Sequence, residues 1–300
     1  MEAIITVVGF LGAGKTTLLK SLINSYVAKG WNPFVILNDY ENANMDAQQF
    51  MDQMSPQCIK PLSGSCICCS GIIELRNTVN NIPERKHGIT LIEANGTSDA
   101  CALMEFLGVG LDSRFLPPIQ ISVVDVEHWQ QRGEHNELEA NQIQVSSLLV
   151  LTHLDKVIDT RKREVISQLQ HLNATAKIIP MDDLDVLLLP ELMPSKNAVQ
   201  QLDHKKAHWA SCSVDLPNLP NATYIHTLCN ALPKHLLRVK GCTVLGDDTN
   251  YTYFERTPSG DVHIRPFNGV PITGSKLLTI GPGSDPSALE QLITAMLSKD

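Results

Sequence analysis

The sequence predicts an α/β fold with a mostly parallel, doubly wound sheet, followed by a smaller C-terminal α+β domain. As far as Met181, short apolar segments alternate with amphipathic ones. Apolar strands separated by amphipathic helices are typical of a parallel sheet that helices cover on both faces. From Pro190 onwards prolines, serines and polar residues accumulate, as they do between domains. The chain is therefore expected to form domains 1–200 and 201–300.

Six apolar segments are expected to form the strands of the first domain. Each is short and bounded by glycine or polar residues, as buried strands are. They are residues 3–8, 33–38, 89–94, 119–125, 146–152 and 176–181.

Amphipathic segments with apolar residues at helical spacing follow these strands. The first is expected to stop at Gly30, because glycine is a common residue just after a helix. The expected helices are residues 15–30, 72–82, 100–108, 138–145 and 160–172.

A different order of elements is expected after residue 200. The expected strands are 236–245, 251–257 and 276–281, and the expected helices are 222–232 and 286–297.

Composition narrows the range of partners. The 300 residues are 43% hydrophobic and carry a formal net charge of −8, so a basic surface for nucleic acid is not expected. The first residues lack a signal-peptide pattern, and no apolar run is long enough to cross a bilayer, so the protein is expected in the cytoplasm, away from membranes. In that compartment structural disulfides are not expected, and a cluster of cysteines favours a metal or redox role, whereas the five scattered cysteines are expected to be small buried apolar residues.

A glycine-rich motif joins the first expected strand to the first expected helix. The stretch GFLGAGKT, residues 9–16, fits G-x-x-x-x-G-K-[ST], whose backbone N–H groups surround phosphate oxygens at a helix start. In this pattern Lys15 reaches the β- and γ-phosphates and the Thr16 hydroxyl binds Mg²⁺. The expected nucleotide-binding residues are Gly9, Gly12, Ala13, Gly14, Lys15, Thr16 and Thr17. The motif predicts a P-loop NTPase.

Two acidic residues follow other expected strands, at the edge where open parallel sheets bind ligands. Glu93 ends one strand, where its carboxylate is expected to hold Mg²⁺ through water. Asp155 occupies the aspartate position of N-K-x-D, a motif whose aspartate accepts hydrogen bonds from guanine, while Thr152 and His153 replace the Asn and Lys. These positions favour GTP and GDP as the nucleotides.

Three thiols lie close together at Cys66, Cys68 and Cys69. Thiolates suit Zn²⁺ or Cu(I), and a closed structural zinc site takes four protein ligands. A local set of three leaves one position open, as a carrier of metal requires. A redox role, in which adjacent thiols cycle through a disulfide, is the alternative.

The stretches GFLGAGKTTLL, GSCICCSGI and IEANGTSD occur in this order, and the chain thereby resembles the CobW family of P-loop GTPases. Near the C-terminus, LLRVKGC and TGSKLLTIGPGSD are similar to further family segments. The resemblance implies a GTPase that binds zinc, cobalt or another transition metal and delivers it to a client metalloprotein. It also implies Asp39 as a ligand of that metal and Asp46 as a ligand of Mg²⁺.

The expected activity is hydrolysis of GTP to GDP and phosphate, with Lys15, Thr16 and Glu93 as catalytic residues. Turnover is expected to be slow for the chain alone, because no arginine finger stands near these motifs. A homo-oligomer is compatible with the sequence. The alternatives are a P-loop metabolite kinase and a non-enzymatic metal buffer that uses nucleotide as a switch.

Overall fold

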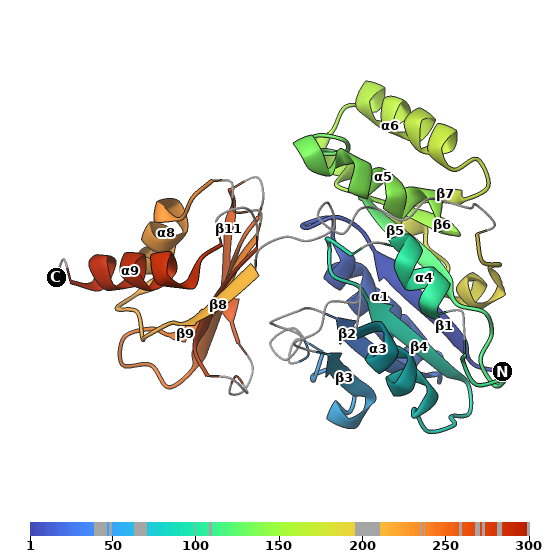
Figure 1. Cartoon of the computed structure of the whole chain (residues 1–300), viewed down its shortest axis with the longest axis horizontal. Coiled ribbons are helices and arrows are strands. Elements are labelled where there is room, and N and C mark those ends of the chain that lie inside the picture. Colours follow the sequence, from blue (N-terminus) through green and yellow to red (C-terminus); the bar gives the residue numbers. More distant parts are fainter. Residues whose placement is uncertain are drawn as a thin grey trace. The chain divides into compact units, whose positions relative to one another are not determined.

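A computed structural model describes most of the chain, and Figure 1 draws the whole of it. The described residues are 1–38, 47, 50–62, 71–98, 100–107, 110–195, 211–234, 236, 238–257, 260–267, 271, 274–280 and 284–298. Contacts between Cα atoms divide the chain into two compact units, Met1–Asp39 with Gln53–His208 and Tyr40–Asp52 with Trp209–Asp300. The predicted boundary near residue 200 lies within 196–210, outside the described residues, and stays a prediction.

The first unit contains a parallel sheet whose strands run in the order β3-β2-β4-β1-β5-β6-β7. Its strands are β1 (Ala3–Val8), β2 (Asn32–Asn38), β3 (Ile59–Leu62), β4 (Gly88–Glu93), β5 (Ile119–Asp125), β6 (Leu148–Thr152) and β7 (Lys177–Pro180). Burial explains their apolar sequences, since β1, β4, β5 and β6 are buried at every residue. The six predicted strands are confirmed, whereas β3 was not predicted.

Helices cover both faces of this sheet, as predicted. They are α1 (Lys15–Ala28), α3 (Gly71–Asn80), α4 (Ala100–Leu107), α5 (Asn136–Gln144) and α6 (Asp159–Leu172). Along the series from α3 to α6 each helix contacts the next, whereas α1 packs on β1, β2 and β4 together with the 3₁₀ helix η5 (Val186–Glu191). Figure 1 shows α3 and α4 in front of the sheet and α1 behind it.

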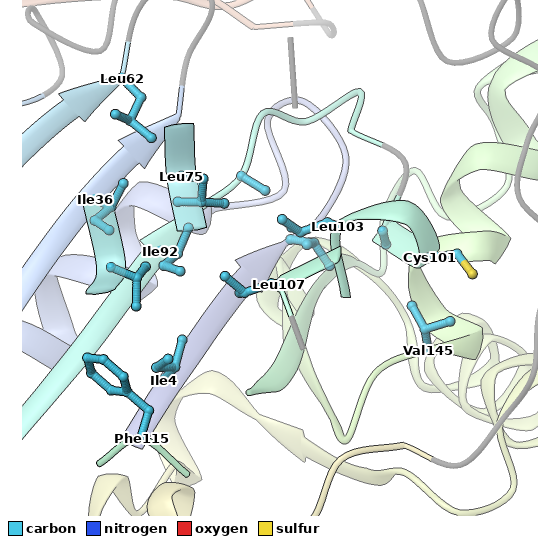
Figure 2. Close-up of a cluster of buried hydrophobic side chains, with 14 of the residues drawn as sticks. Ile4, Ile36, Leu62, Leu75, Ile92, Cys101, Leu103, Leu107, Phe115 and Val145 are labelled. Atoms are coloured by element: carbon cyan, nitrogen blue, oxygen red, sulfur yellow. The ribbon is translucent and has the colours of Figure 1, made fainter. Parts of the chain in front are cut away.

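An apolar cluster joins α3 and α4 to the sheet (Figure 2). Ile4, Ile36 and Ile92 come from three neighbouring strands and meet Leu75 of α3 and Leu103 of α4. Each of these side chains is at most 1% exposed. Burial of apolar surface stabilises a fold by about 25 cal/mol per Å², so this cluster holds α3 and α4 against the three strands.

The second unit contains an antiparallel sheet in the order β11-β10-β9-β12-β8, which agrees with the predicted α+β class. Its elements are β8 (Ser211–Asp215), α8 (Ala222–Ala231), β9 (Arg238–Val244), β10 (Tyr251–Arg256), β11 (Val262–Pro266), β12 (Lys276–Ile280) and α9 (Pro286–Leu297). Residues of α8 and α9 pack against the sheet in one apolar cluster. The strands β8 and β11 were not predicted from the sequence. Among the described residues of the chain no helix combines the length and apolar character needed to cross a bilayer.

Gly241 in β9 has a structural role in this second sheet. It lies opposite Phe254 of β10, and a Cβ atom added at Gly241 would come within 2.1 Å of the Phe254 ring. The missing side chain therefore makes room for a fully buried aromatic ring.

We expect Gly241→Ala to destabilise the second unit by about 1–3 kcal/mol, the usual cost of an overpacked core. Urea unfolding followed by circular dichroism measures the change. Ser213→Ala in β8 is the control, because it adds no atom to the interior. Equal unfolding midpoints for Gly241→Ala and the wild-type chain would contradict the prediction.

Candidate functional site

The loop between β1 and α1 has a backbone that requires glycine. Gly9, Gly12 and Gly14 have φ angles of 143°, 81° and 100°, in the region that side chains other than glycine rarely adopt. Gly9 is also confined by β5, since a Cβ atom there would lie 2.5 Å from the carbonyl oxygen of Val123. The glycines predicted from the motif are thus needed for the shape of the loop and for its packing on the sheet.

Lys15, the first residue of α1, folds back over the start of the loop. Its Nζ donates to the carbonyl oxygens of Gly9 (2.9 Å) and Phe10 (3.2 Å), and the residue is only 4% exposed. The first turn of α1 contains no acidic residue, so no side chain of the helix itself offsets the positive end of its dipole. Gly12 and Thr17 are exposed beside it. These features make the loop suitable for an anion.

Thr16 and Glu93 come together at the end of this loop. Glu93 ends β4, and the parallel register places it beside Val7 near the end of β1. The Thr16 hydroxyl donates to Oε1 of Glu93 at 3.0 Å, and Glu93 is 8% exposed. A hydroxyl and a carboxylate are the oxygen ligands that Mg²⁺ prefers. The structure therefore brings together the two residues expected around Mg²⁺.

Thr152 ties the far end of β6 to the loop. Its hydroxyl oxygen lies 2.8 Å from the carbonyl oxygen of Ala13 and 3.1 Å from that of Val124. Its methyl group also lies 3.5 Å from the position of a Cβ atom at Gly14. Thr152 was expected at the nucleotide site, and the structure places it as a support of the loop backbone.

Asp125, at the end of β5, was not singled out in the sequence although it follows the same pattern as Glu93. It is 4% exposed, and its register partner in β6 is Thr152, so His153 lies within its reach. Nδ1 of His153 lies 2.8 Å from Oδ1, whereas Nδ1 of His128 (3.0 Å) and Nη2 of Arg132 (2.9 Å) lie near Oδ2. One carboxylate thus holds three basic side chains.

The pKa of Asp125 follows from these contacts. Burial, the largest single effect, would raise the pKa, whereas the hydrogen bond and the charge of His153 lower it. The charges of Arg132 and His128 act in the same direction, so the pKa lies far below its usual range. Asp125 is therefore an ionised, acceptor-only group at any ordinary pH.

Arg132 connects Asp125 to the loop and to α5. Its guanidinium lies 4.8 Å from the ring centroid of Phe10. Nε of Arg132 lies 3.6 Å from Oε1 of Glu139. Burial raises the pKa of Glu139 to about 7, although Arg132 and the N–H of Gln130 lower it. Glu139 therefore titrates near neutral pH.

Asp155 lies in the short 3₁₀ helix η3 (Leu154–Lys156) that follows β6, and it is exposed.

A cluster of possible metal ligands lies nearby in the sequence: ligand atoms of Asp125, Glu127 and His153 lie within 4.8 Å of one another. Arg132 already pairs with Asp125, and Nζ of Lys156 lies 3.7 Å from Oε2 of Glu127, so cations of the chain balance both carboxylates.

The expected ligands of the transition metal, and a further expected ligand of Mg²⁺, belong to parts of the chain that the structure does not describe. They are Cys66, Cys68, Cys69, Asp39 and Asp46. The structure brings Thr152 into contact with the phosphate-binding loop, and the roles of these five residues as metal ligands stay predictions.

The strand, glycine loop and helix, with a lysine and a threonine at the loop's end, define a P-loop nucleotide-binding domain. The profile of the family described as CobW/HypB/UreG, nucleotide-binding domain, matches residues 3–180, and the chain belongs to this family. The resemblance found in the sequence is thereby confirmed.

Three relatives indicate where the chain stands within this family. It is 29% identical to the zinc chaperone YjiA of Escherichia coli strain K12, over 62% of this chain and 60% of that one. It is 23% identical to zinc-regulated GTPase metalloprotein activator 1 of Dictyostelium discoideum, over 57% of this chain and 44% of that one. It is 25% identical to the zinc chaperone CobW of Pseudomonas aeruginosa PAO1, over 78% of this chain and 75% of that one. The matches to the first two relatives thus cover less than two thirds of the length of those proteins.

The support that Thr152 gives to the loop can be tested by Thr152→Val. This change removes the hydroxyl that bonds Ala13 and Val124 but keeps the side-chain shape, so GDP binding should weaken about fivefold, for a loss of about 1 kcal/mol. Thr152→Ser keeps the hydroxyl and is the control. Calorimetric titration with GDP and Mg²⁺ measures both variants, and equal affinity of Thr152→Val and the wild-type chain would refute the role.

The raised pKa of Glu139 predicts a pH-dependent stability. Glu139 is uncharged in the folded chain below pH 7 but ionises in the unfolded chain near pH 4.5. Below pH 4.5 Glu139 is therefore uncharged in both states and does not lower the free energy of unfolding. As the pH rises to 7, the free energy of unfolding falls by about 3 kcal/mol, because the unfolded chain loses this proton first.

Glu139→Gln should reduce this loss, so that its urea midpoint falls less between pH 5 and pH 8 than that of the wild-type chain. Glu137→Gln, an exposed position in the same helix, is the control and should follow the wild type. The same pH dependence in wild type and Glu139→Gln would show that Glu139 is not the group responsible.

Proposed function

We propose that this protein is a metal-binding GTPase that hydrolyses GTP and delivers zinc, or another transition metal such as cobalt, to a client metalloprotein. The observation that carries the proposal is the pairing of Thr16 with Glu93 at 3.0 Å, at the end of a phosphate-binding loop. Membership of the CobW/HypB/UreG family supports it. The printed names of the relatives, two zinc chaperones and a zinc-regulated GTPase activator, support the choice of metal.

Mg²⁺ fits the oxygen donors of Thr16 and Glu93, which would hold it directly or through water. When bound, the ion supplies positive charge to the phosphate oxygens. The chain itself contributes the ammonium of Lys15, the N–H groups of the loop and the N-terminus of α1, all of which stabilise negative charge on the phosphoryl group that is transferred. Glu93 also orients water at this edge, because its carboxylate ends a buried strand and is held by Thr16.

Specificity for guanine is assigned to Asp155. Its exposed carboxylate follows β6, whose Thr152 contacts the phosphate loop, so a nucleotide can extend from the loop to Asp155. A carboxylate offers two acceptors to the two N–H groups of guanine, whereas adenine presents no such pair of donors at this edge. We therefore propose GTP and GDP as the nucleotides of this site.

The cargo metal is assigned to Cys66, Cys68 and Cys69, with Asp39 as a further ligand; these residues lie outside the described parts of the chain. Three thiolates select a soft or borderline ion such as Zn²⁺, and an open coordination position allows a client side chain to take the metal. Intrinsic hydrolysis is proposed to be slow. Arg132 does not serve as an arginine finger, because Asp125 and Glu139 already hold its buried side chain.

The proposal is tested with the purified wild-type chain, a variant in which Cys66, Cys68 and Cys69 are replaced by serine, and Lys15→Ala. We expect the serine variant to lose zinc and keep GDP binding, because its phosphate loop is unchanged. Lys15→Ala should keep zinc and release phosphate from GTP at least about 100-fold more slowly, as removal of one charge-stabilising donor usually does.

Metal analysis, GDP titration and phosphate release measure the three effects. Release of free phosphate without formation of a phosphorylated second substrate is also expected, since a kinase would transfer the phosphoryl group to such a substrate. Unchanged zinc content in the serine variant, or no phosphate release by the wild-type chain with zinc and Mg²⁺ present, would contradict the proposal.

A further inference from the structure

We propose that Gln142 of α5 is a positioning residue for GTP hydrolysis, because it holds the segment that begins at the end of β4 against the phosphate loop. This segment, residues 93–98, is called the Glu93 segment below. The inference rests on the proposed function, since it concerns the hydrolysis that Glu93 assists. It extends the site to α5, a helix that carries none of the nucleotide-binding motifs.

The Glu93 segment contacts the phosphate loop at Gly96. A Cβ atom added at Gly96 would lie 2.6 Å from Cδ2 of Leu11 and 2.9 Å from its backbone nitrogen. Leu11 is the third residue of the loop motif and is fully buried. The segment therefore starts with the carboxylate that bonds Thr16 and then runs against the loop itself, so a displacement of the segment would move Glu93 relative to the loop.

Gln142 fixes this segment from the side of α5. The residue is 1% exposed, and its Nε2 lies 3.2 Å from the carbonyl oxygen of Gly96 and 3.4 Å from that of Ser98. Carbonyl oxygens can only accept hydrogen bonds, so the atom that faces both of them is the amide nitrogen of Gln142. One buried amide group thus donates to two carbonyls of the Glu93 segment.

The backbone of Gln142 is in turn anchored to the sheet. Its carbonyl oxygen accepts from Nε2 of Gln120 in β5 at 3.1 Å and from Oγ of Ser146 at 2.7 Å. Both partners are fully buried, and the register partner of Gln120 in β1 is Thr6. Hydrogen bonds therefore connect β5, the neighbour of the strand that leads into the loop, through α5 to the Glu93 segment.

Gly96 also has a donor that the described part of the chain does not use. The residue is buried, and its N–H meets no acceptor among the described residues. The residues around it form a turn, in which the N–H groups of Thr97 and Ser98 bond Asn95. A buried N–H without an acceptor is costly, so an acceptor outside the chain, a phosphate oxygen or a water, is expected here. Gln142 holds the carbonyl of the same residue and thereby restricts the direction of this N–H.

Hydrolysis depends on this placement more than nucleotide binding does. In the reaction water adds to the terminal phosphorus of GTP, the bond to the bridging oxygen breaks, and GDP leaves with that oxygen. Small displacements of the groups that orient reactants reduce the rate strongly. Binding of GDP is assigned to the loop and to Lys15, whereas the side chain of Gln142 bonds the Glu93 segment. Loss of Gln142 should therefore lower kcat and leave the affinity for GDP nearly unchanged.

Two neighbouring amides in α5 provide the variant and its matched control. Gln142→Met keeps the length of the side chain but removes the donor to both carbonyls. Asn141 is also buried, at 3% exposure, yet its side-chain nitrogen and oxygen have no hydrogen-bond partner among the described residues. Asn141→Leu replaces this unpaired amide with an apolar group, a change that is neutral or stabilising, and serves as the control.

Phosphate release from GTP by the full chain with Mg²⁺ and zinc gives kcat and KM, and calorimetric titration with GDP gives the Kd. Gln142→Met should lower kcat about five- to tenfold, the effect of one lost hydrogen bond, and keep the Kd for GDP within about twofold of the wild-type value. Asn141→Leu should match the wild-type chain in both. The double variant should show the same fall in kcat relative to Asn141→Leu, and it keeps the test valid if Gln142→Met alone does not fold.

A wild-type kcat in Gln142→Met would overturn the inference. So would a fall in kcat with an equal loss of GDP affinity, because a general loss of structure affects both, and so would an equal fall in kcat in Asn141→Leu. Absence of phosphate release by the wild-type chain would overturn the proposed function and this inference with it. The two failures are distinguishable, because only in the first does the wild-type chain hydrolyse GTP.

Discussion

The alignment of four strand ends is the constraint on which the rest of the structure depends. β4, β1, β5 and β6 are neighbours in a parallel sheet, so their carboxyl ends reach the same edge. Each contributes to one region: β1 leads into the glycine loop, Glu93 of β4 holds Thr16, Asp125 of β5 holds His153, and β6 supports the loop through Thr152. The conformation of the glycine loop therefore does not depend on the loop's own sequence alone. Its shape is supported by hydrogen bonds from strands that are far apart in the chain, and two buried apolar clusters pack helices against those strands.

The two ends of the site share one network. Arg132 lies over the Phe10 ring of the phosphate loop and pairs with Asp125, which orients His153 on the side assigned to the base. Buried polar groups of this kind are costly unless each is paired, and the pairing here runs from the loop through β5 to β6. His153 is thus three contacts away from the Phe10 ring, through Asp125 and Arg132. Such a connection gives a physical route by which the geometry of the base side and that of the phosphate side influence each other.

The sequence predicted the interior of both sheets better than their edges. The strands that were missed, β3, β8 and β11, all lie at the edges of the two described sheets. Edge strands are short, and proline and charged residues are tolerated in them because one side makes no ladder hydrogen bonds, so β3 (IKPL) and β11 (VHIRP) lack the apolar signal of a buried strand. At the site, the loop motif and Glu93 were recognisable from local patterns. Asp125 ends an apolar strand in the same way, but its partners His153 and Arg132 could be assigned only from the strand order and register.

The most direct test of the account is the structure of the chain crystallised with GDP and Mg²⁺. The account predicts that the β-phosphate accepts hydrogen bonds from the N–H groups of the loop and from Nζ of Lys15, with Thr16 and Glu93 at the metal and the carboxylate of Asp155 at the guanine N–H groups. A diphosphate bound away from residues 9–16, or a base directed away from Asp155, would contradict it.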